Sequence, residues 1–324
     1  MTKHVNKIFW IALLAFLLAY PILFGAYYTN VVVIFGVMSL FALTVNLLLG
    51  FTGLLSFGHA MFFGVGAYAT ALSLTHIEGL PLLVAILIGI ASSAAFALLL
   101  CPMLVRASGT AFTMLTLAFS MLMYTLSLKL RDITGGEDGI GGFNIPDLSL
   151  PGVFSIEMTD PLNFYYFALV VILASMWALW FLTKTPFGTV IIAIRDNAMR
   201  VNYMGYKVTH TKALVIVVSS SFAGVAGAVY ALFQNLVSSD GVFGPMMSFA
   251  PIIMTVIGGV GSFFGPIWGS GILMLLEEVV TIFTERFSLV SGIVLVMVVM
   301  FAPMGVVGMM RIGKAKWLLR RQNS

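Results

Sequence analysis

The chain has 324 residues, of which 60% are hydrophobic and only 9% are charged, and its formal net charge is +4. This composition is typical of an integral membrane protein, and the basic balance fits loops at a membrane surface rather than nucleic-acid binding. The only cysteine, Cys101, excludes an internal disulfide and a thiolate metal cluster, and the four histidines are too scattered to suggest metal ligation. We therefore expect no metal or other cofactor.

Apolar runs along the chain predict an all-α membrane protein, because about 20 apolar residues cross a bilayer as a helix. The clear runs are residues 8–28, 31–50, 54–74, 82–105, 111–128, 164–182, 213–236 and 289–310. The first run follows Lys3 and Lys7, as the apolar part of a secretory signal would, but it is too long for one and no clear cleavage site follows it. We count it as a span.

Residues 247–283 are also apolar, but glycines at 258–261 and a Gly-Pro pair at 265–266 interrupt them. Lys212 marks the loop before the preceding span as internal, and the tail from Arg311 is basic, so the chain must cross an even number of times within this stretch. Two short crossings, or a re-entrant pair that meets at the glycines, satisfy this condition. The total is then about ten spans, with both termini in the cytoplasm.

Charged residues sort between the two ends of these spans, because Lys and Arg near a spanning helix are retained in the cytoplasm. The basic segments contain Lys3, Lys7, Arg106, Lys184, Arg195, Arg200, Lys207, Lys212, Arg311, Lys314, Lys316, Arg320 and Arg321. The acidic segments contain Glu78, Asp132, Glu137, Asp138, Asp147, Glu157, Asp160, Asp240, Glu277, Glu278 and Glu285. The exceptions are Lys129, Arg131, Arg286 and Asp196. This sorting predicts an acidic external loop at 129–163, a basic internal loop at 183–211, and no carboxylate in the hydrocarbon interior.

The internal loop has the pattern of an amphipathic surface helix. An apolar stripe at three- and four-residue spacing consists of Val190, Ile191, Ile194, Ala198 and Val201. Asp196 and Arg200 are spaced for an ion pair along the helix, and Gly205 suits a C-terminal cap. Such a helix docks onto a cytoplasmic partner or lies on the membrane interface, and the sequence leaves both open. The sequence contains no phosphate-binding loop motif, so we do not expect this chain to hydrolyse ATP.

Polar residues within the apolar runs are candidates for a substrate path. One face of residues 111–128 carries hydroxyls at Thr113, Thr116, Ser120, Tyr124 and Ser127. Such a face lines a path for a polar solute, or it bonds its own helix carbonyls and neighbouring helices. His59, near Ser56 and Asn46, is a second candidate, although a neutral imidazole bonded to a backbone carbonyl is also tolerated there. Small residues in 220–231 and 261–269 predict close helix packing.

Residues 46–60 (NLLLGFTGLLSFGHA) resemble the opening signature of the branched-chain amino-acid ABC transporter permeases, the LivH/LivM family. The resemblance to the LivM type continues in order through TGG at 134–136, DG at 138–139, PFG at 186–188, AIRDN at 193–197, MGYK at 204–207, AGVAGA at 223–228, GVG at 259–261 and GP at 265–266. The general coupling motif of ABC importers, Glu-Ala-Ala with a later Gly, is met only loosely around residues 197–205.

The resemblance implies one transmembrane domain over residues 1–324 with an ABC importer (type II-like) permease fold, in the bacterial inner membrane. It implies a homologous second permease, two cytoplasmic ATP-binding subunits and a periplasmic substrate-binding protein as partners. The implied substrates are branched-chain or related small hydrophobic amino acids. Urea and short-chain amides are the alternative, because their permeases share most of these blocks.

From the residues and the resemblance together we expect two sets of functional residues. The substrate path is expected to include Asn46, Ser56, His59, Thr113, Thr116 and Ser120. Coupling to the ATP-binding subunits is expected at Ile194, Arg195, Asp196, Ala198, Arg200 and Gly205. An ion-coupled secondary transporter would use the break near 258–266, but it lacks mid-span carboxylates here. An intramembrane enzyme would need an acidic partner for His59, and none is obvious.

Overall fold

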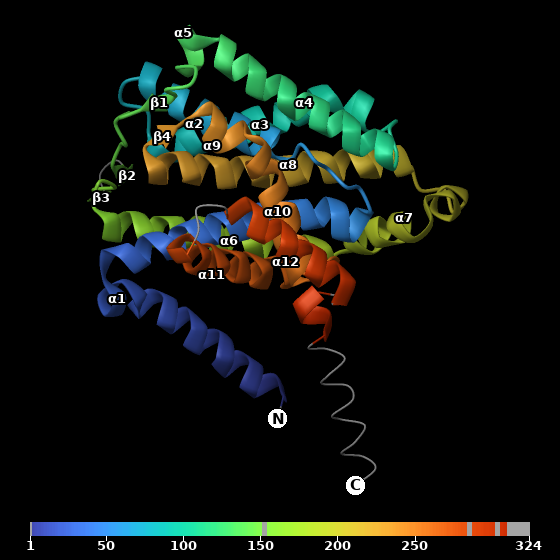
Figure 1. Ribbon diagram of the computed structural model, residues 1–324. Helices are drawn as coiled ribbons and strands as arrows, with labels where there is room; N and C mark the ends of the chain where they lie inside the picture. The colour runs from blue at the N-terminus through green and yellow to red at the C-terminus, as the bar shows by residue number, and fades with distance from the viewer. Residues whose placement is uncertain (1, 151–153, 284–286, 302–304, 310–324) are drawn as a thin grey trace.

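The computed structural model describes residues 2–150, 154–283, 287–301 and 305–309, and these are mostly helical (Figure 1). In chain order the elements are α1 (Thr2–Asn46), the π-helix η1 (Leu47–Thr52), α2 (Ala60–His76), α3 (Leu82–Leu104), α4 (Thr110–Lys129), α5 (Arg131–Thr134), β1 (Ile140–Gly141), β2 (Leu148–Leu150), β3 (Phe154–Ile156), α6 (Pro161–Lys184), α7 (Pro186–Tyr203), α8 (Val208–Gln234), β4 (Leu236–Val237), α9 (Ser239–Phe243), α10 (Pro245–Gly258), α11 (Gly265–Phe283) and α12 (Phe287–Phe301). Glu285, Arg286 and the basic tail from Arg311 to Arg321 lie outside the described residues.

Seven helical segments of the described residues are long and apolar enough to cross a membrane, so the predicted count of about ten is not confirmed. They are Tyr27–Thr52, Leu82–Leu104, Thr110–Lys129, Pro161–Lys184, Val208–Gln234, Ser239–Gly258 and Gly265–Ile282. The predicted span 54–74 falls short because its helix begins only at Ala60. The predicted first span, 8–28, lies around a kink in α1, where Gly25 has a φ of 75°.

The two ends of the bundle carry opposite charge. Helix α7 lies at one end, and α5 lies with the four short strands at the other (Figure 1). The α7 end carries Arg106, Lys184, Arg195, Arg200, Lys207 and Lys212, with Asp196 as an exception. The other end carries Glu78, Asp132, Glu137, Asp138, Asp147, Glu157, Asp160 and Asp240, with Lys129 and Arg131 as exceptions. The structure thus groups these charges at two ends as the sequence predicts, and the cytoplasmic orientation of the α7 end stays a prediction from the distribution of basic residues.

Four short strands, three of them in the predicted external loop 129–163, are the departure from an all-α fold. Strand β1 pairs antiparallel with β4, so that Ile140 lies opposite Val237. Strands β2 and β3 form a separate two-stranded hairpin. The β1–β4 pair joins the predicted external loop to the link between α8 and α9.

The glycine-rich stretch near the C-terminus folds as two short helices, as an even number of crossings requires. Helix α10 ends at Gly258 and α11 begins at Gly265. A Cβ on Gly258 would clash with the carbonyl oxygen of Gly265, and a Cβ on Gly269 would clash with that of Met254. These contacts pair the end of one helix with the start of the other, so α10 and α11 form an antiparallel hairpin around the turn 259–264.

Helices α2, α3 and α8 form the tightest part of the core because glycines let their backbones touch. A Cβ on Gly66 of α2 would lie 2.5 Å from the Cα of Gly224 of α8. The hydroxyl of Ser93, on α3, donates to the carbonyl oxygen of Ser220 at 2.7 Å. The close packing predicted for residues 220–231 is confirmed, and it fixes the position of α2 and of the chain that leads into it.

Candidate substrate path and coupling site

Residues 53–59, called the extended segment below, are non-helical and join η1 to α2. η1 ends at Gly53, whose φ of 75° lies in the left-handed region that glycine adopts without strain. The prediction of a continuous helix from residue 54 was therefore wrong. Irregular backbone within a membrane is tolerated only where it packs against protein or lines a cavity, so the contacts of this segment indicate its role.

Helix α4 supplies hydrogen bonds to the extended segment. The hydroxyl of Thr113 donates to the carbonyl oxygen of Leu55 at 3.0 Å, and the N–H of Phe57 donates to Oγ1 of Thr116 at 3.2 Å. A Cβ on Gly58 would clash with the carbonyl oxygen of Thr116, so the two backbones are in contact there. These side-chain bonds replace part of the backbone bonding that a helix would have provided.

The predicted hydroxyl face of α4 is therefore turned toward the extended segment and α10. Thr113, Thr116 and Ser120 are all buried. The hydroxyl of Ser120 lies 3.3 Å from that of Ser248 on α10. The structure thus brings three predicted path residues to one seam, with their hydroxyls on protein groups in this conformation.

His59 joins three helices inside the bundle. Its Nε2 lies 3.1 Å from the hydroxyl of Thr44 on α1 and 3.2 Å from the hydroxyl of Ser219, near the middle of α8. The Ser219 hydroxyl donates to the carbonyl oxygen of Thr44 at 2.7 Å, and the imidazole stacks on Phe41. The ring thus meets hydroxyls rather than the backbone carbonyl that the sequence suggested.

Two buried polar atoms of this region have no hydrogen-bond partner among the described residues. They are Oγ of Ser56, whose residue is 1% exposed, and Nδ1 of His59. An unsatisfied buried polar atom costs about 1–3 kcal/mol, so such groups favour water or a polar solute when one is present. The extended segment therefore keeps free polar groups inside the bundle.

Asn46 is fully buried at the junction of α1 and η1, and its amide is engaged by the α10–α11 turn. Its Nδ2 donates to the carbonyl oxygen of Ser262, and its Oδ1 accepts from the N–H of Gly261, both at 3.0 Å. This geometry separates Asn46 from the other predicted path residues, which gather around the extended segment.

Helix α7 is interrupted at Asn197, which has non-helical dihedrals. The Oδ1 of Asn197 accepts from the N–H of Arg200 at 2.9 Å, as an N-cap does, and a second short helical piece follows. The break removes the spacing expected for an Asp196–Arg200 pair, and Asp196 instead forms an ion pair with Arg195 at 3.1 Å. The predicted pair was wrong for this reason.

The apolar stripe of α7 faces its own bundle. Ile191, Ile194 and Val201 are buried against this chain, and Val190 and Ala198 are half-buried. In the structure this chain itself therefore covers the stripe, and the expected contact of Ile194 with a partner stays a prediction. The surface that α7 leaves exposed includes Asp196, Met199, Arg200, Tyr203 and the adjoining Met204, with Tyr203 82% exposed.

The predicted cap at Gly205 is confirmed. Gly205 has a φ of 89° directly after the last helical turn. The N–H of Tyr206 donates to the carbonyl oxygen of Val201, and the N–H of Gly205 donates to that of Asn202. This is the Schellman arrangement, which satisfies the last carbonyl groups and turns the chain toward α8.

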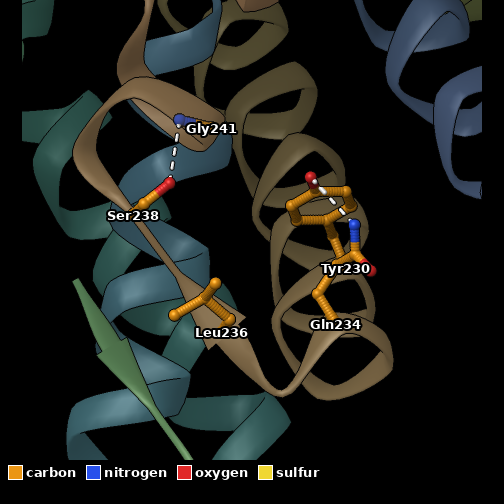
Figure 2. Close-up of a pocket in the computed structure, with 5 residues that line it drawn as sticks. All are labelled: Tyr230, Gln234, Leu236, Ser238 and Gly241. Atoms are coloured by element: carbon orange, nitrogen blue, oxygen red, sulfur yellow. Dashed lines mark hydrogen bonds between the residues drawn. The ribbon is translucent and has the colours of Figure 1, made fainter. Parts of the chain in front are cut away.

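At the end of the bundle opposite α7, an open pocket of about 150 Å³ lies between α8, β4 and α9 (Figure 2). Tyr230, Gln234, Leu236, Ser238 and Gly241 line it. The amide of Gln234 donates to the Tyr230 hydroxyl at 3.4 Å, and the Ser238 hydroxyl accepts from the N–H of Gly241 and caps α9. Sequence reasoning did not find this pocket, because it depends on where β4 turns back beside α8.

Residues 27–301 match the sequence profile of a family described as branched-chain amino acid transport system / permease component. The chain belongs to this family. It is 28% identical to the high-affinity branched-chain amino acid transport system permease protein LivM of Salmonella typhimurium, over 94% of this chain and 76% of that protein. The LivM protein of Escherichia coli K12 gives the same identity and the same two shares. A probable LivH of Methanocaldococcus jannaschii is 26% identical over 79% of this chain and 84% of its own. No solved structure matches the chain significantly.

In this permease, several residues that bond to the predicted site residues could not be identified from the sequence. Thr44, Ser219 and Ser248 are single hydroxyls in apolar helices, where most such groups bond their own backbone. Asn197 did carry a signal, because asparagine is a preferred N-cap and can divide a helix. The apolar stripe nevertheless predicted one continuous helix, because a hydropathy pattern does not take this N-cap preference into account.

Proposed function

We propose that this chain is a permease subunit of an ABC importer that moves branched-chain amino acids across the bacterial inner membrane. The observation that carries this proposal is the family match over residues 27–301 together with the LivM and LivH relatives. The names of those relatives favour branched-chain amino acids over urea or short-chain amides. A second homologous permease, two cytoplasmic ATP-binding subunits and a periplasmic substrate-binding protein complete the proposed transporter.

The proposed substrate path follows the seam between the extended segment, α4 and α10. Ser56 offers an unpartnered polar atom there, and Thr113, Thr116 and Ser120 offer hydroxyls whose present partners are neutral. His59, in the same segment, adds an unpartnered Nδ1 where its ring lies between α1 and α8. The ring centroids of Phe57 and Phe249 lie 5.3 Å apart across the same seam. Neutral hydroxyls beside aromatic rings suit a zwitterion with an aliphatic side chain, which needs weak polar contacts and apolar surface to pass without being trapped.

The proposed contact with the ATP-binding subunits is the exposed edge of α7, and not its apolar stripe. Met199, Tyr203 and Met204 are 64%, 82% and 70% exposed, and Arg200 lies beside them. Large exposed apolar side chains next to a charge are common at the centres of protein interfaces. The buried Ile194 and the capping Gly205 then hold this edge in position, while Asp196, Ala198 and Arg195 shape the bend before it.

An ion-coupled carrier is the competing class, and Glu277 and Glu278 of α11 are the residues that would serve it. They lie toward the external end of α11, where Glu278 accepts a hydrogen bond from the Tyr27 hydroxyl. They are far along the chain from the extended segment, and the described part of the proposed path contains no carboxylate.

Energy dependence and substrate competition test the proposal. Cells that express the complete set of subunits should take up labelled leucine after the proton gradient is collapsed, and uptake should stop when ATP is depleted. Excess isoleucine or valine should compete with leucine, whereas urea and acetamide should not. Uptake that follows the proton gradient would instead assign the chain to the ion-coupled class.

A further inference from the structure

The π-helix η1 contacts both α7 and the α10–α11 turn at the cytoplasmic end of the bundle. Arg195 of α7 places its guanidinium over the end of η1, where Nη1 donates to the carbonyl oxygen of Gly50 at 2.7 Å. Carbonyl groups in the last turn of a helix lack intrahelical partners, and the helix dipole favours a cation beside them. Arg195 supplies both the missing donor and the positive charge.

Asn46 joins the α10–α11 turn to the start of η1. Its amide donates to Ser262 and accepts from Gly261, so a single buried side chain holds the turn 259–264 against the junction of α1 and η1. Because both polar atoms of the amide are used, a shift of η1 either carries the turn with it or breaks two buried hydrogen bonds.

Gly53 and Gly261 have no side chains that could separate Arg195 from η1 and the turn. A Cβ on Gly261 would lie 3.2 Å from Nη1 of Arg195 and 3.2 Å from the carbonyl oxygen of Gly50. A Cβ on Gly53 would lie 2.9 Å from Cγ of Arg195. The arginine side chain therefore crosses the end of η1 in direct contact with the backbone and reaches the edge of the turn.

We propose that Arg195 and Asn46 are positioning residues that transmit movement of α7 through η1 to the α10–α11 hairpin. This inference rests on the proposed function, in which ATP-binding subunits move α7. It assigns Asn46 to transmission and not to substrate contact, because both polar atoms of its buried amide already bond the α10–α11 turn. The movement reaches the proposed path at two places, since η1 continues into the extended segment and α10 carries Ser248, which lies beside Ser120.

The covalent connections of α7 do not provide this route. They lead through Thr185 to α6 and through residues 204–207 to α8, and neither helix carries the α10–α11 turn. Ile191 and Ile194 hold α7 on the bundle independently of Arg195. Loss of the Arg195 contact should therefore leave α7 folded and docked, while its connection to the hairpin is lost.

The first test uses the complete transporter in liposomes, with its ATP-binding subunits and leucine-loaded binding protein. For Arg195→Gln and for Asn46→Ala, we expect the ratio of stimulated to basal ATP hydrolysis to fall roughly tenfold, because the first loses one hydrogen bond from a charged group and the second loses two neutral ones. Lys184→Gln is the matched control, because Lys184 is an exposed cytoplasmic cation at the end of α6 that lies over the Trp180 ring. It should keep the wild-type ratio.

The double variant distinguishes one route from two. If Arg195 and Asn46 act in series, Arg195→Gln with Asn46→Ala loses no more stimulation than the more severe single variant. Additive losses, or a wild-type ratio in either single variant, would overturn the proposal. A failure of the proposed function looks different, because the wild-type complex itself would then show no leucine-stimulated hydrolysis.

A distance measurement tests the mechanical link without using activity. Spin labels at Asn202 on α7 and at Val260 in the turn, both exposed, are introduced in a Cys101→Ser background. In the otherwise wild-type complex their separation should stay constant when ATP binds. In the Arg195→Gln variant, the distribution of distances between the two labels should shift or broaden when ATP binds. If this distance already changes in the otherwise wild-type complex, the proposed link is contradicted.

Discussion

The hydroxyl of Ser120 on α4 lies 3.3 Å from the hydroxyl of Ser248 on α10, and both residues are buried. This contact joins the two helices that flank the extended segment through a neutral hydrogen bond. Such a bond contributes only about 0.5–1.5 kcal/mol, so a passing solute can replace it at small cost. The seam can therefore open without leaving an unpaired charge.

Bulk at Ser120 should block transport. Ser120→Phe fills the seam beside Ser248, and we expect leucine uptake to be lost while membrane insertion and subunit assembly remain. Ser120→Ala removes only one neutral hydrogen bond, of about 1 kcal/mol, and should keep most of the uptake. Initial uptake rates, with immunoblots for protein amount, provide the measurement. Normal uptake by Ser120→Phe removes this face of α4 from the path.

The contact of the extended segment with α4 should be sensitive to a single methyl group. Gly58→Ala places a Cβ against the backbone carbonyl of Thr116, which cannot rotate away, and should lower the free energy of unfolding by about 1–3 kcal/mol. Gly292→Ala is the control, because a Cβ there meets nothing within 4 Å. Thermal unfolding in detergent compares the two. Equal midpoints would contradict the backbone contact.

The two faces of α7 should respond differently to truncation. Tyr203→Ala, on the exposed edge, should weaken co-purification of the ATP-binding subunits and leave thermal stability unchanged. Ile194→Ala, on the buried stripe, should destabilise the permease by about 2–5 kcal/mol through cavity formation. If Ile194→Ala instead releases the subunits at unchanged stability, the stripe faces outward in the assembled transporter.

The cap at Gly205 should require a residue that tolerates a positive φ. Gly205→Val places a β-branched residue at a φ of 89°, which costs at least about 1–2 kcal/mol, so we expect loss of uptake with the protein still inserted. Gly205→Asn should retain much more uptake, because asparagine also occupies left-handed caps. Equal uptake by the two variants would show that the cap geometry is not needed.

Chemical labelling tests which end of the bundle faces the cytoplasm. In a Cys101→Ser background, a cysteine at Asp138 should react with an impermeant thiol reagent added from the periplasm, and a cysteine at Lys207 should react only after cell lysis. Both positions are exposed, so access depends on the side of the membrane. Labelling at 207 in sealed cells would reverse the topology. A third labelling position, Asn323, which is expected to be internal because both termini are predicted to be cytoplasmic, lies outside the described residues.

Long apolar helices were predictable because hydropathy alone determines them. The predicted spans 82–105, 111–128 and 164–182 differ by only a few residues from α3, α4 and α6. The extended segment was not predictable in the same way. Its residues are as apolar as those of a helix, and the groups that stabilise its backbone, Thr113 and Thr116, lie far away in the sequence.

The face of α7 shows a second limit of sequence patterns. The spacing from Val190 to Val201 correctly indicates that one side is apolar, but a stripe does not reveal what covers it. The structure covers it with this chain's own bundle. The contact of Arg195 with Gly50 was even less predictable, because it joins residues that no short motif connects.

The glycine contacts among α2, α3 and α8 have a consequence for how the molecule can move. Where the backbones of Gly66 and Gly224 touch, no flexible side-chain layer exists that could rearrange as one helix slides past another. We therefore expect these three helices to stay fixed relative to one another, as one rigid unit. The hairpin of α10 and α11 is joined to α1 instead, through Asn46 at its turn and through Thr255 and Ser270 along its helices, so we expect α1 and the hairpin to move together against these three helices.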